Sequence, residues 1–254
     1  MKKLSFILIC SLILSAAEVI KVGITPYPNA LIMESVKDDL KALGYELQVV
    51  EFNDYILPNL ALNDGELDAN IYQHKPFLDD FNESKGTKLI AAANYALAPM
   101  AAYSKKIKNI NELKDKALIY IPNDSTNESR ALDILENAGL ITTDKSVKLR
   151  TILDITSNPK NLVIKELEAA QIPRVLDECD LAVINTNYAL GAKLNPMKDS
   201  IIIESIDSPF VNIIAVRLGD EESPKTKALI KVIQSEKVKD ILKINFQGSL
   251  IPAF

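Results

Sequence analysis

Asn127 and Arg130 are the two side chains whose types and spacing most directly suggest chemistry. They stand three residues apart in a helix predicted over residues 125–138, so they share one side of its first turns. Ser125 and Glu128 have the spacing of a capping box, which predicts the helix start at Ser125. An amide, a guanidinium and free N–H groups at a helix N-terminus suit a small carboxylate, because the dipole and the arginine fork both favour an anion. A capped helix with a solvated surface arginine fits these residues equally well.

Other polar and aromatic side chains stand near the ends of predicted strands. In open α/β sheets, ligands bind at the carboxyl ends of the strands. The side chains at such positions come from both halves of the chain, which predicts a cleft between two domains. They are Tyr55, Tyr72, His74, Asn185 and, inside an apolar run, Asn212. The structural alternative is that the tyrosines are core aromatics and that His74 makes a core hydrogen bond.

The sequence predicts no catalytic residue, no metal site and no cofactor. His74 is the only histidine, and there is no HxxxH, no CxxC and no carboxylate cluster at metal-ligand spacing. No GxSxG elbow supplies a nucleophile, and the eight glycines form no phosphate-binding loop. One enzymatic alternative stays open, a secreted hydrolase in which His74 acts with Asp54 or Asp68.

Short apolar strands alternate with amphipathic helices, which predicts an α/β fold with largely parallel sheets. The chain opens with a strand–helix–strand unit. The predicted strands are 18–24, 46–52, 67–71, two runs within 88–102, 117–121, 147–152, 181–184, 201–204 and 211–216. The predicted helices lie within 29–43, 75–81, 125–138, 162–176 and 224–244, and a further helix begins around Pro58 and contains Leu60 and Leu62.

Composition and charge exclude several partners. The 254 residues are 48% hydrophobic and 25% charged, which is ordinary for a globular protein. The net charge is −5 and there is no basic block, so neither nucleic acid nor an anionic membrane surface is an expected partner.

The first 17 residues have the pattern of a signal peptide, which predicts a periplasmic protein. Lys2 and Lys3 precede an apolar run at 4–14, and small residues lead to a cleavage site after Ala17. Cleavage removes two positive charges, so the net charge becomes −5 − 2 = −7. Lipid anchoring at Cys10 is the lesser alternative, because no small residue precedes it. Cys179, the other cysteine, is expected to be a small buried residue.

Several motifs resemble one protein family over essentially the whole mature chain. They are FNDY at 52–55, DANIYQH at 68–74, PNDSTNESRAL at 122–132, Asp154-Ile155 with Asn158-Pro159, ELEAAQ at 166–171, VIN at 183–185 and Val211-Asn212. In this order they resemble the NlpA/MetQ family of methionine-binding proteins. That resemblance implies a two-lobed periplasmic binding protein fold with a ligand cleft between the lobes. It also implies a monomer that delivers its ligand to an ABC permease in the inner membrane.

The resemblance also implies roles for individual residues. Arg130 would pair with the carboxylate of L- or D-methionine, and three amides would bind its polar groups: Asn127, Asn185 and Asn212. Four side chains would form the wall for the thioether: Tyr55, Tyr72, His74 and Phe77. Tyr72 stands where phenylalanine is usual and Phe77 where tyrosine is common. These exchanges leave open a methionine-containing dipeptide, another apolar amino acid or an organic anion as the ligand.

The predicted lobes are discontinuous in sequence. Lobe 1 combines residues 18–103 with 211–254, and lobe 2 spans 104–210. The crossing segments are expected at 98–105 and 208–216.

Overall fold

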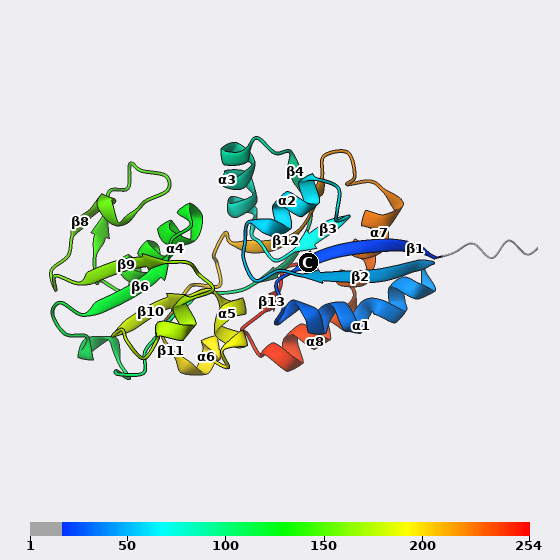
Figure 1. Cartoon of the computed structure of the whole chain (residues 1–254). Helices are drawn as coiled ribbons and strands as arrows, with labels where there is room; N and C mark the ends of the chain where they lie inside the picture. The colour runs from blue at the N-terminus through cyan, green and yellow to red at the C-terminus, as the bar shows by residue number, and fades with distance from the viewer. Residues whose placement is uncertain (1–16) are drawn as a thin grey trace, which may run out of the picture.

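The computed structural model describes residues 17–254, which form two α/β lobes (Figure 1). Each lobe is built on its own β-sheet. The predicted signal peptide, with Cys10 in it, lies outside the described residues apart from Ala17. Within the described part of the chain, no helix is both long and apolar enough to cross a membrane.

The first lobe contains both ends of the described chain. Its strands are β1 (Glu18–Ile24), β2 (Tyr45–Glu51), β3 (Ala69–Ile71), β4 (Leu89–Leu97), β12 (Val211–Arg217) and β13 (Ile251–Pro252). Its helices are α1 (Asn29–Ala42), α2 (Leu57–Asn63), α3 (Lys75–Lys85), α7 (Pro224–Ile233) and α8 (Glu236–Phe246). The predicted strand–helix–strand opening is confirmed, since β1 and β2 pair in parallel around α1.

The second lobe is formed by the middle of the chain. Its sheet contains β5 (Ala101–Tyr103), β6 (Leu118–Pro122), β9 (Val163–Leu167), β10 (Leu181–Ile184) and β11 (Ser200–Ile203). Its α-helices are α4 (Ser125–Asn137), α5 (Thr186–Gly191) and α6 (Pro196–Asp199). Short 3-10 turns at Ile110–Glu112, Ile152–Asp154 and Ile172–Val175, and a ribbon of β7 (Thr142–Thr143) with β8 (Ile155–Ser157), complete it.

Both sheets are mixed, so the prediction of largely parallel sheets is wrong. The first sheet has the order β13-β4-β12-β3-β1-β2, and its parallel pairs are β1 with β2 and with β3. The second has the order β11-β5-β10-β6-β9, and its parallel pairs are β6 with β9 and with β10. Most of the antiparallel pairing comes from β5 and β12, which the chain enters after each crossing between the lobes, and β13 adds an antiparallel pair with β4.

Apolar side chains at helical spacing hold α1 against the first sheet. Ile32, Val36 and Leu40 recur on one face of α1 and are buried against strand residues such as Val22 and Ile24. Burying an aliphatic side chain of this size stabilises the fold by about 1.5–3 kcal/mol relative to its exposure. The helix is therefore held by its apolar face, as the spacing predicts.

The same principle positions α4 in the second lobe. Leu132 and Leu135 of α4 are buried in one core with Ile119 and Ile121 of β6. This packing aims the first turn of α4 at the space between the lobes, which Figure 1 shows beside α3. Cys179 is buried in a neighbouring core, as predicted for a small apolar residue.

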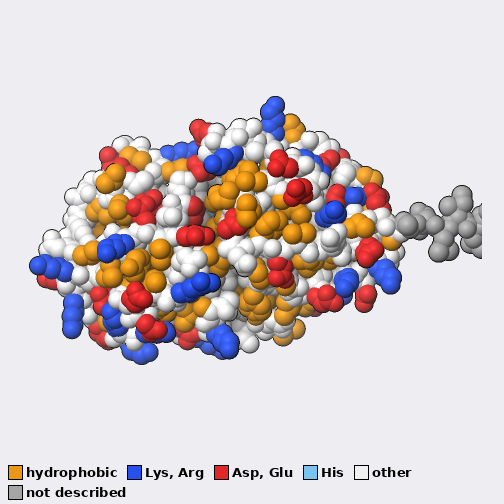
Figure 2. All heavy atoms as spheres, in the orientation of Figure 1, with side chains coloured by type: hydrophobic (Ala, Val, Ile, Leu, Met, Phe, Trp, Pro, Cys, Tyr) orange, Lys and Arg blue, Asp and Glu red, His pale blue; other side chains and the backbone are white. Residues whose placement is uncertain are grey.

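Charged side chains of both signs are distributed over the outside of the two lobes. On the face shown in Figure 2, lysine and arginine side chains lie among aspartate and glutamate side chains, with no large patch of one sign. A mixed surface of this kind agrees with the modest net charge of −5. This face therefore offers no basic stripe of the sort that would bind nucleic acid.

Two predicted elements in the second lobe are wrong. The segment 162–176 is not a helix: β9 (Val163–Leu167) pairs with β6, and a 3-10 turn follows at Ile172–Val175. The apolar spacing there fits a helix, but β6 offers an open backbone edge and Pro173 ends regular structure. No strand spans 147–152, because Thr151 instead caps the 3-10 turn that begins at Ile152.

The chain passes between the two sheets twice, at residues 98–100 and 204–210. The lobe limits of 104 and 210 stay a prediction. Strand pairing nevertheless assigns β5 to the second sheet, since its residues pair with β10 and β11. The two crossing segments matter for the site, because both reach the same arginine of α4.

Candidate ligand-binding cleft

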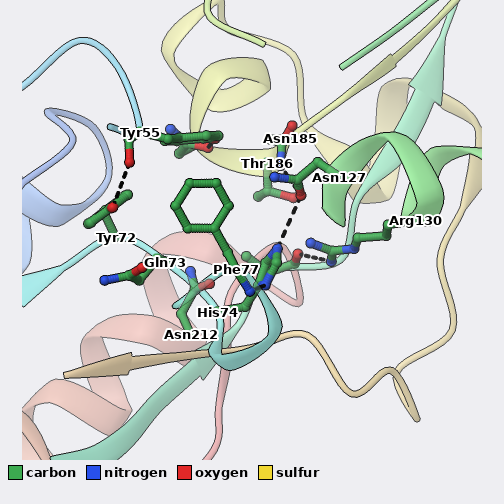
Figure 3. A pocket seen from close by; sticks show the side chains of 12 residues that line it. Tyr55, Tyr72, Gln73, His74, Phe77, Asn127, Arg130, Asn185, Thr186 and Asn212 are labelled. Carbon is green, nitrogen blue, oxygen red and sulfur yellow. Dashed lines mark hydrogen bonds between the residues drawn. The ribbon is translucent and has the colours of Figure 1, made fainter. Parts of the chain in front are cut away.

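A cavity lies between the lobes, and side chains of both lobes line it. All eight side chains singled out from the sequence line it. The complete lining is Tyr55, Tyr72, Gln73, His74, Phe77, Ala98, Asn127, Arg130, Asn185, Thr186, Asn187 and Asn212. Figure 3 shows the labelled side chains converging from both lobes.

The aromatic wall of the cavity comes from the first lobe. Phe77, at the start of α3, meets Tyr55 and Tyr72 edge-on, with ring centroids 6.0 and 6.3 Å apart. The hydroxyl of Tyr72 donates to the backbone oxygen of Tyr55 at 2.7 Å. The hydroxyl gained at position 72 therefore has a partner in the protein, and the wall it helps to form is apolar.

A buried amide network supports this wall from behind. Gln73 Nε2 donates to Asn59 Oδ1 at 2.6 Å and to Asn70 Oδ1 at 2.9 Å, and Asn59 Nδ2 donates back to Gln73 Oε1 at 2.8 Å. Mutual bonding satisfies these buried amides without water. Gln73 lines the cavity and was not predicted, although it stands between Tyr72 and His74 in a singled-out motif.

Asp124, and not Ser125, caps the helix that carries Asn127 and Arg130. Its Oδ1 accepts from the Asn127 backbone N–H at 3.0 Å and from the Asn127 side-chain Nδ2 at 2.8 Å. The predicted capping box is therefore wrong in its residues. Ser125 instead donates to Asp80 of the other lobe at 2.6 Å, and Glu128 accepts from the Ile152 N–H.

A chain of hydrogen bonds fixes three side chains across the cleft. Asp124 holds the Asn127 amide so that its Oδ1 faces His74 Nε2 at 3.1 Å and Asn185 Nδ2 at 2.9 Å. His74 Nδ1 accepts from the Phe77 N–H at 3.1 Å, so the proton of the neutral ring lies on Nε2 and is donated to Asn127. Figure 3 shows this link between the lobes.

The same chain leaves one buried acceptor at the cavity wall. Asn185 donates through Nδ2, and no donor among the described residues reaches its buried Oδ1. A buried amide oxygen of this kind favours a ligand that brings an N–H group. The sequence predicted Asn185 as a binding residue, and in the structure it lines the cavity with its Oδ1 unpaired among the described residues.

Burial keeps His74 neutral. The pKa of His74 is lowered from 6.5 to about 3, first because burial disfavours the charged ring and second because the Arg130 guanidinium lies nearby. His74 therefore acts as a hydrogen-bond donor and not as a cation at neutral pH. Arg130 is left as the cationic side chain among those that line the cavity.

Arg130 is buried and held on three sides. Its Nε donates to Glu204 Oε1 at 2.8 Å, and its Nη2 donates to Glu204 Oε2 and to the Ala98 backbone oxygen, the latter at 3.0 Å. The Phe210 ring lies under the guanidinium at 4.4 Å. None of these bonds uses Nη1. Glu204 was not predicted as part of the site, and no local signal in the sequence singles it out.

Two further contacts join the lobes at the rim. The Tyr55 hydroxyl donates to Asn187 Oδ1 at 2.6 Å, and the Tyr188 hydroxyl donates to the Asn53 backbone oxygen at 3.3 Å. The Tyr55 and Tyr188 rings lie 5.1 Å apart. The lobes are thus in contact around the cavity, which is the arrangement of a closed cleft.

The remaining lining residues follow a strand end that the sequence had already marked. Thr186 and Asn187 come directly after Asn185 at the start of α5, and the polar run Asn185-Thr186-Asn187 was the signal that could have identified them. Ala98 belongs to a crossing segment and contributes its backbone. Among the described residues, no group of three or more histidine, cysteine or acidic side chains could hold a metal ion.

Two lobes closed over a cavity with a cation, amides and an aromatic wall define a binding protein for a small polar ligand. The chain belongs to the NlpA lipoprotein family, which it matches over residues 20–254. The D-methionine-binding lipoprotein MetQ of Escherichia coli K12 is 42% identical over 236 residues, which cover 91% of this chain and 87% of that protein. The family resemblance seen in the sequence motifs is therefore confirmed.

Solved structures share the whole fold. A nutrient-binding protein of Burkholderia cenocepacia, solved bound to methionine, has a TM-score of 0.90 and 44% identity, covering 92% of this chain and 100% of the other. A periplasmic substrate-binding protein of an ABC transporter from Coxiella burnetii has a TM-score of 0.88 and 41% identity, with coverage of 92% and 100%. The two-lobed architecture is confirmed by these matches.

Proposed function

We propose that this protein is the periplasmic substrate-binding component of an ABC importer and that it binds methionine, as the L- or D-isomer, in the cleft. The observation that carries the proposal is the meeting of three features in one cavity. A buried guanidinium, asparagine amides and an aromatic wall all line it, and one amide oxygen, Oδ1 of Asn185, has no donor among the described residues. An amino acid with an apolar side chain supplies the matching groups.

Each part of the ligand has a counterpart. Arg130 offers Nη1 to the carboxylate, since its other nitrogens are used within the protein. Asn185 Oδ1 and the Asn212 amide bind the ammonium group, and Asn127 keeps Asn185 in the required orientation. The wall of Tyr55, Tyr72 and Phe77 receives the thioether, for which aromatic rings are favourable neighbours.

The hydrolase alternative finds little support in the geometry. A general base needs a free ring nitrogen within reach of the proton that it removes. In His74, Nδ1 accepts from the Phe77 N–H and Nε2 donates to Asn127, so both nitrogens are engaged. We therefore infer a binding role without catalysis.

Export of the protein rests on its leader and its relatives. The signal peptide predicted at 1–17 supports a periplasmic location, where the ligand would be delivered to a permease in the inner membrane. The MetQ relative is named a lipoprotein, which supports lipid anchoring at Cys10 more than the residues around Cys10 do by themselves.

The test is calorimetric titration of L- and D-methionine into protein that was unfolded, dialysed free of ligand and refolded. We expect stoichiometric binding of at least one isomer. Arg130→Ala should weaken that binding by about 30-fold or more, because it removes charge-assisted bonds worth about 2–5 kcal/mol. Arg174→Ala, which removes an exposed arginine of the same lobe, is the matched control.

Two outcomes would contradict the proposal. Near-normal affinity of Arg130→Ala for methionine would show that the guanidinium does not bind the ligand carboxylate. If folded protein binds neither isomer, the ligand would be one of the other compounds considered above: a methionine-containing dipeptide, another apolar amino acid or an organic anion. Mass spectrometry of the material released on unfolding would then identify it.

A further inference from the structure

Glu204 is the partner of the arginine that faces the ligand. Its carboxylate accepts from both Nε and Nη2 of Arg130, the forked geometry in which arginine and a carboxylate bind most strongly. The side chains of Arg130 and Glu204 are 4% and 10% exposed, respectively, so water screens the pair weakly. The guanidinium plane is thereby fixed, with Nη1 outside the pair.

Glu204 is itself anchored to the opposite crossing segment. Its backbone N–H donates to the Met100 oxygen at 2.9 Å, and its Oε2 accepts from the Met100 N–H at 3.1 Å. Both carboxylate oxygens are thus occupied, and the side chain has no freedom to turn toward the cavity. Phe210, farther along the same crossing segment, covers the guanidinium face.

The charges around the cavity decide what kind of carboxylate it accepts. An unpaired arginine would give the site a net positive charge and would favour anions in general. Glu204 balances the charge of Arg130 by accepting from its Nε, and Asp124 adds another carboxylate, which accepts from the Asn127 side chain. His74 contributes no positive charge, since burial holds it neutral.

We propose that Glu204 is a positioning residue for Arg130 that makes the cleft select zwitterionic amino acids over simple carboxylate anions. This inference rests on the proposed function and adds the feature that rejects a ligand lacking the ammonium group. Glu204 does not touch the ligand. It acts by orienting the guanidinium and by attracting the ammonium group that a simple anion lacks.

The size of the effect follows from charge separation. The ammonium of a bound amino acid would lie on the other side of the guanidinium from the Glu204 carboxylate. Two unit charges roughly 8 Å apart, at an effective dielectric constant near 20, attract each other enough to change the affinity for methionine relative to that for an anion by about tenfold or more. The zwitterion and the anion both carry the ligand carboxylate, so the interaction of that group with Glu204 cancels when their affinities are compared. The change in the ratio of the two affinities on substitution of Glu204 therefore reports the charge of Glu204.

The experiment measures selectivity. Methionine and its des-amino analogue, 4-(methylthio)butanoate, are titrated into ligand-free wild type, Glu204→Gln and Glu204→Asp. We expect the ratio of the analogue's Kd to that of methionine to fall about tenfold in Glu204→Gln. Glu204→Asp should keep a ratio near that of the wild type, because it restores the charge even where its shorter reach weakens both affinities.

Controls separate charge selection from a structural defect. Glu222→Gln removes an exposed carboxylate far from the cleft, paired with Lys227, and should leave both affinities unchanged. Glu204→Met is a second neutral variant of similar volume, which places no amide N–H against the donors of Arg130 and Met100, and its ratio should fall as in Glu204→Gln. Circular dichroism and thermal melting verify that each variant is folded.

The failures of the two proposals are distinguishable. If the wild type binds methionine but the neutral variants keep its ratio, the role of Glu204 is overturned and the proposed function stands. If the folded wild type binds neither compound, the proposed function fails and the role of Glu204 fails with it. A ratio that falls equally in Glu204→Asp would assign the effect to geometry and would overturn selection by charge.

Discussion

Replacement of His74 by glutamine should change how stability depends on pH. In the folded protein the pKa of His74 is about 3, because the ring is buried beside Arg130, whereas an unfolded histidine titrates near 6.5. Below pH 6.5 the unfolded chain therefore takes up a proton that the folded protein refuses. The stability that the neutral ring provides is fully present above pH 6.5 and is lost progressively as the pH falls toward 3.

At pH 5 the unfolded histidine is almost fully protonated and the folded one almost fully neutral, so the difference amounts to about 2 kcal/mol. This value hardly changes for any folded pKa below about 4, because at pH 5 it is set by the unfolded state. The amide introduced by His74→Gln would retain a side-chain N–H for Asn127 but would not titrate.

The assay is urea unfolding of ligand-free protein at pH 7.5 and pH 5. The free energy of unfolding should fall by about 2 kcal/mol more in the wild type than in His74→Gln between these conditions. Carboxylates titrate in both proteins and cancel in the comparison. Equal losses in the two proteins would refute a neutral buried histidine, and a larger loss in the variant would reverse the sign of the reasoning.

Two further predictions concern the lobe contacts and a buried carboxyl group. Tyr55→Phe and Asn187→Ala should each weaken methionine binding several-fold, because each removes the same interlobe hydrogen bond, worth about 1 kcal/mol. In titration calorimetry the double variant should bind no more weakly than the single variants, and additive losses would contradict a shared bond. The pKa of Glu128 is raised to about 7 by burial and by nearby Glu166, so wild-type stability should fall as the pH rises from about 4.5 through 7. In urea unfolding at pH 8, the free energy of unfolding of Glu128→Gln should exceed that of the wild type by on the order of 1 kcal/mol, after allowance for solvent screening, and at pH 4 the two should be equal. The same difference at both pH values would contradict a pKa of Glu128 raised by burial.

Most elements of the first lobe could be predicted from periodicity, because their apolar faces are strongly patterned. The spacing of Ile32, Val36 and Leu40 defines α1, and the helix pair after residue 224 follows the same rule. The polar residues at strand ends also converge as expected, since a sheet brings those ends to one edge. Local pattern is sufficient where local burial decides the structure.

The errors occur where a distant partner decides the structure. β9 is a strand because β6, more than forty residues earlier, offers a parallel edge in register from Leu118↔Val163 to Pro122↔Leu167. Asp124 takes the helix cap because Ser125 is drawn to Asp80 of the other lobe. Glu204 meets Arg130 across 74 residues of sequence, with no spacing rule to reveal it. Contacts of this range are invisible to pattern analysis of a single sequence.

Closure and ligand recognition use the same residues, which explains how a small molecule can shift the equilibrium between open and closed lobes. His74 with Asn127, Tyr55 with Asn187 and Asp80 with Ser125 join the lobes directly, each contributing about 0.5–1.5 kcal/mol net. A ligand that bonds Arg130 and Asn185 of the second lobe while it packs on Phe77 of the first binds the closed state better, and only this difference in affinity can drive closure. Arg130 is tied to both crossing segments through Ala98 and Glu204, so the residue proposed to receive the carboxylate is also the one that the crossing segments hold in place.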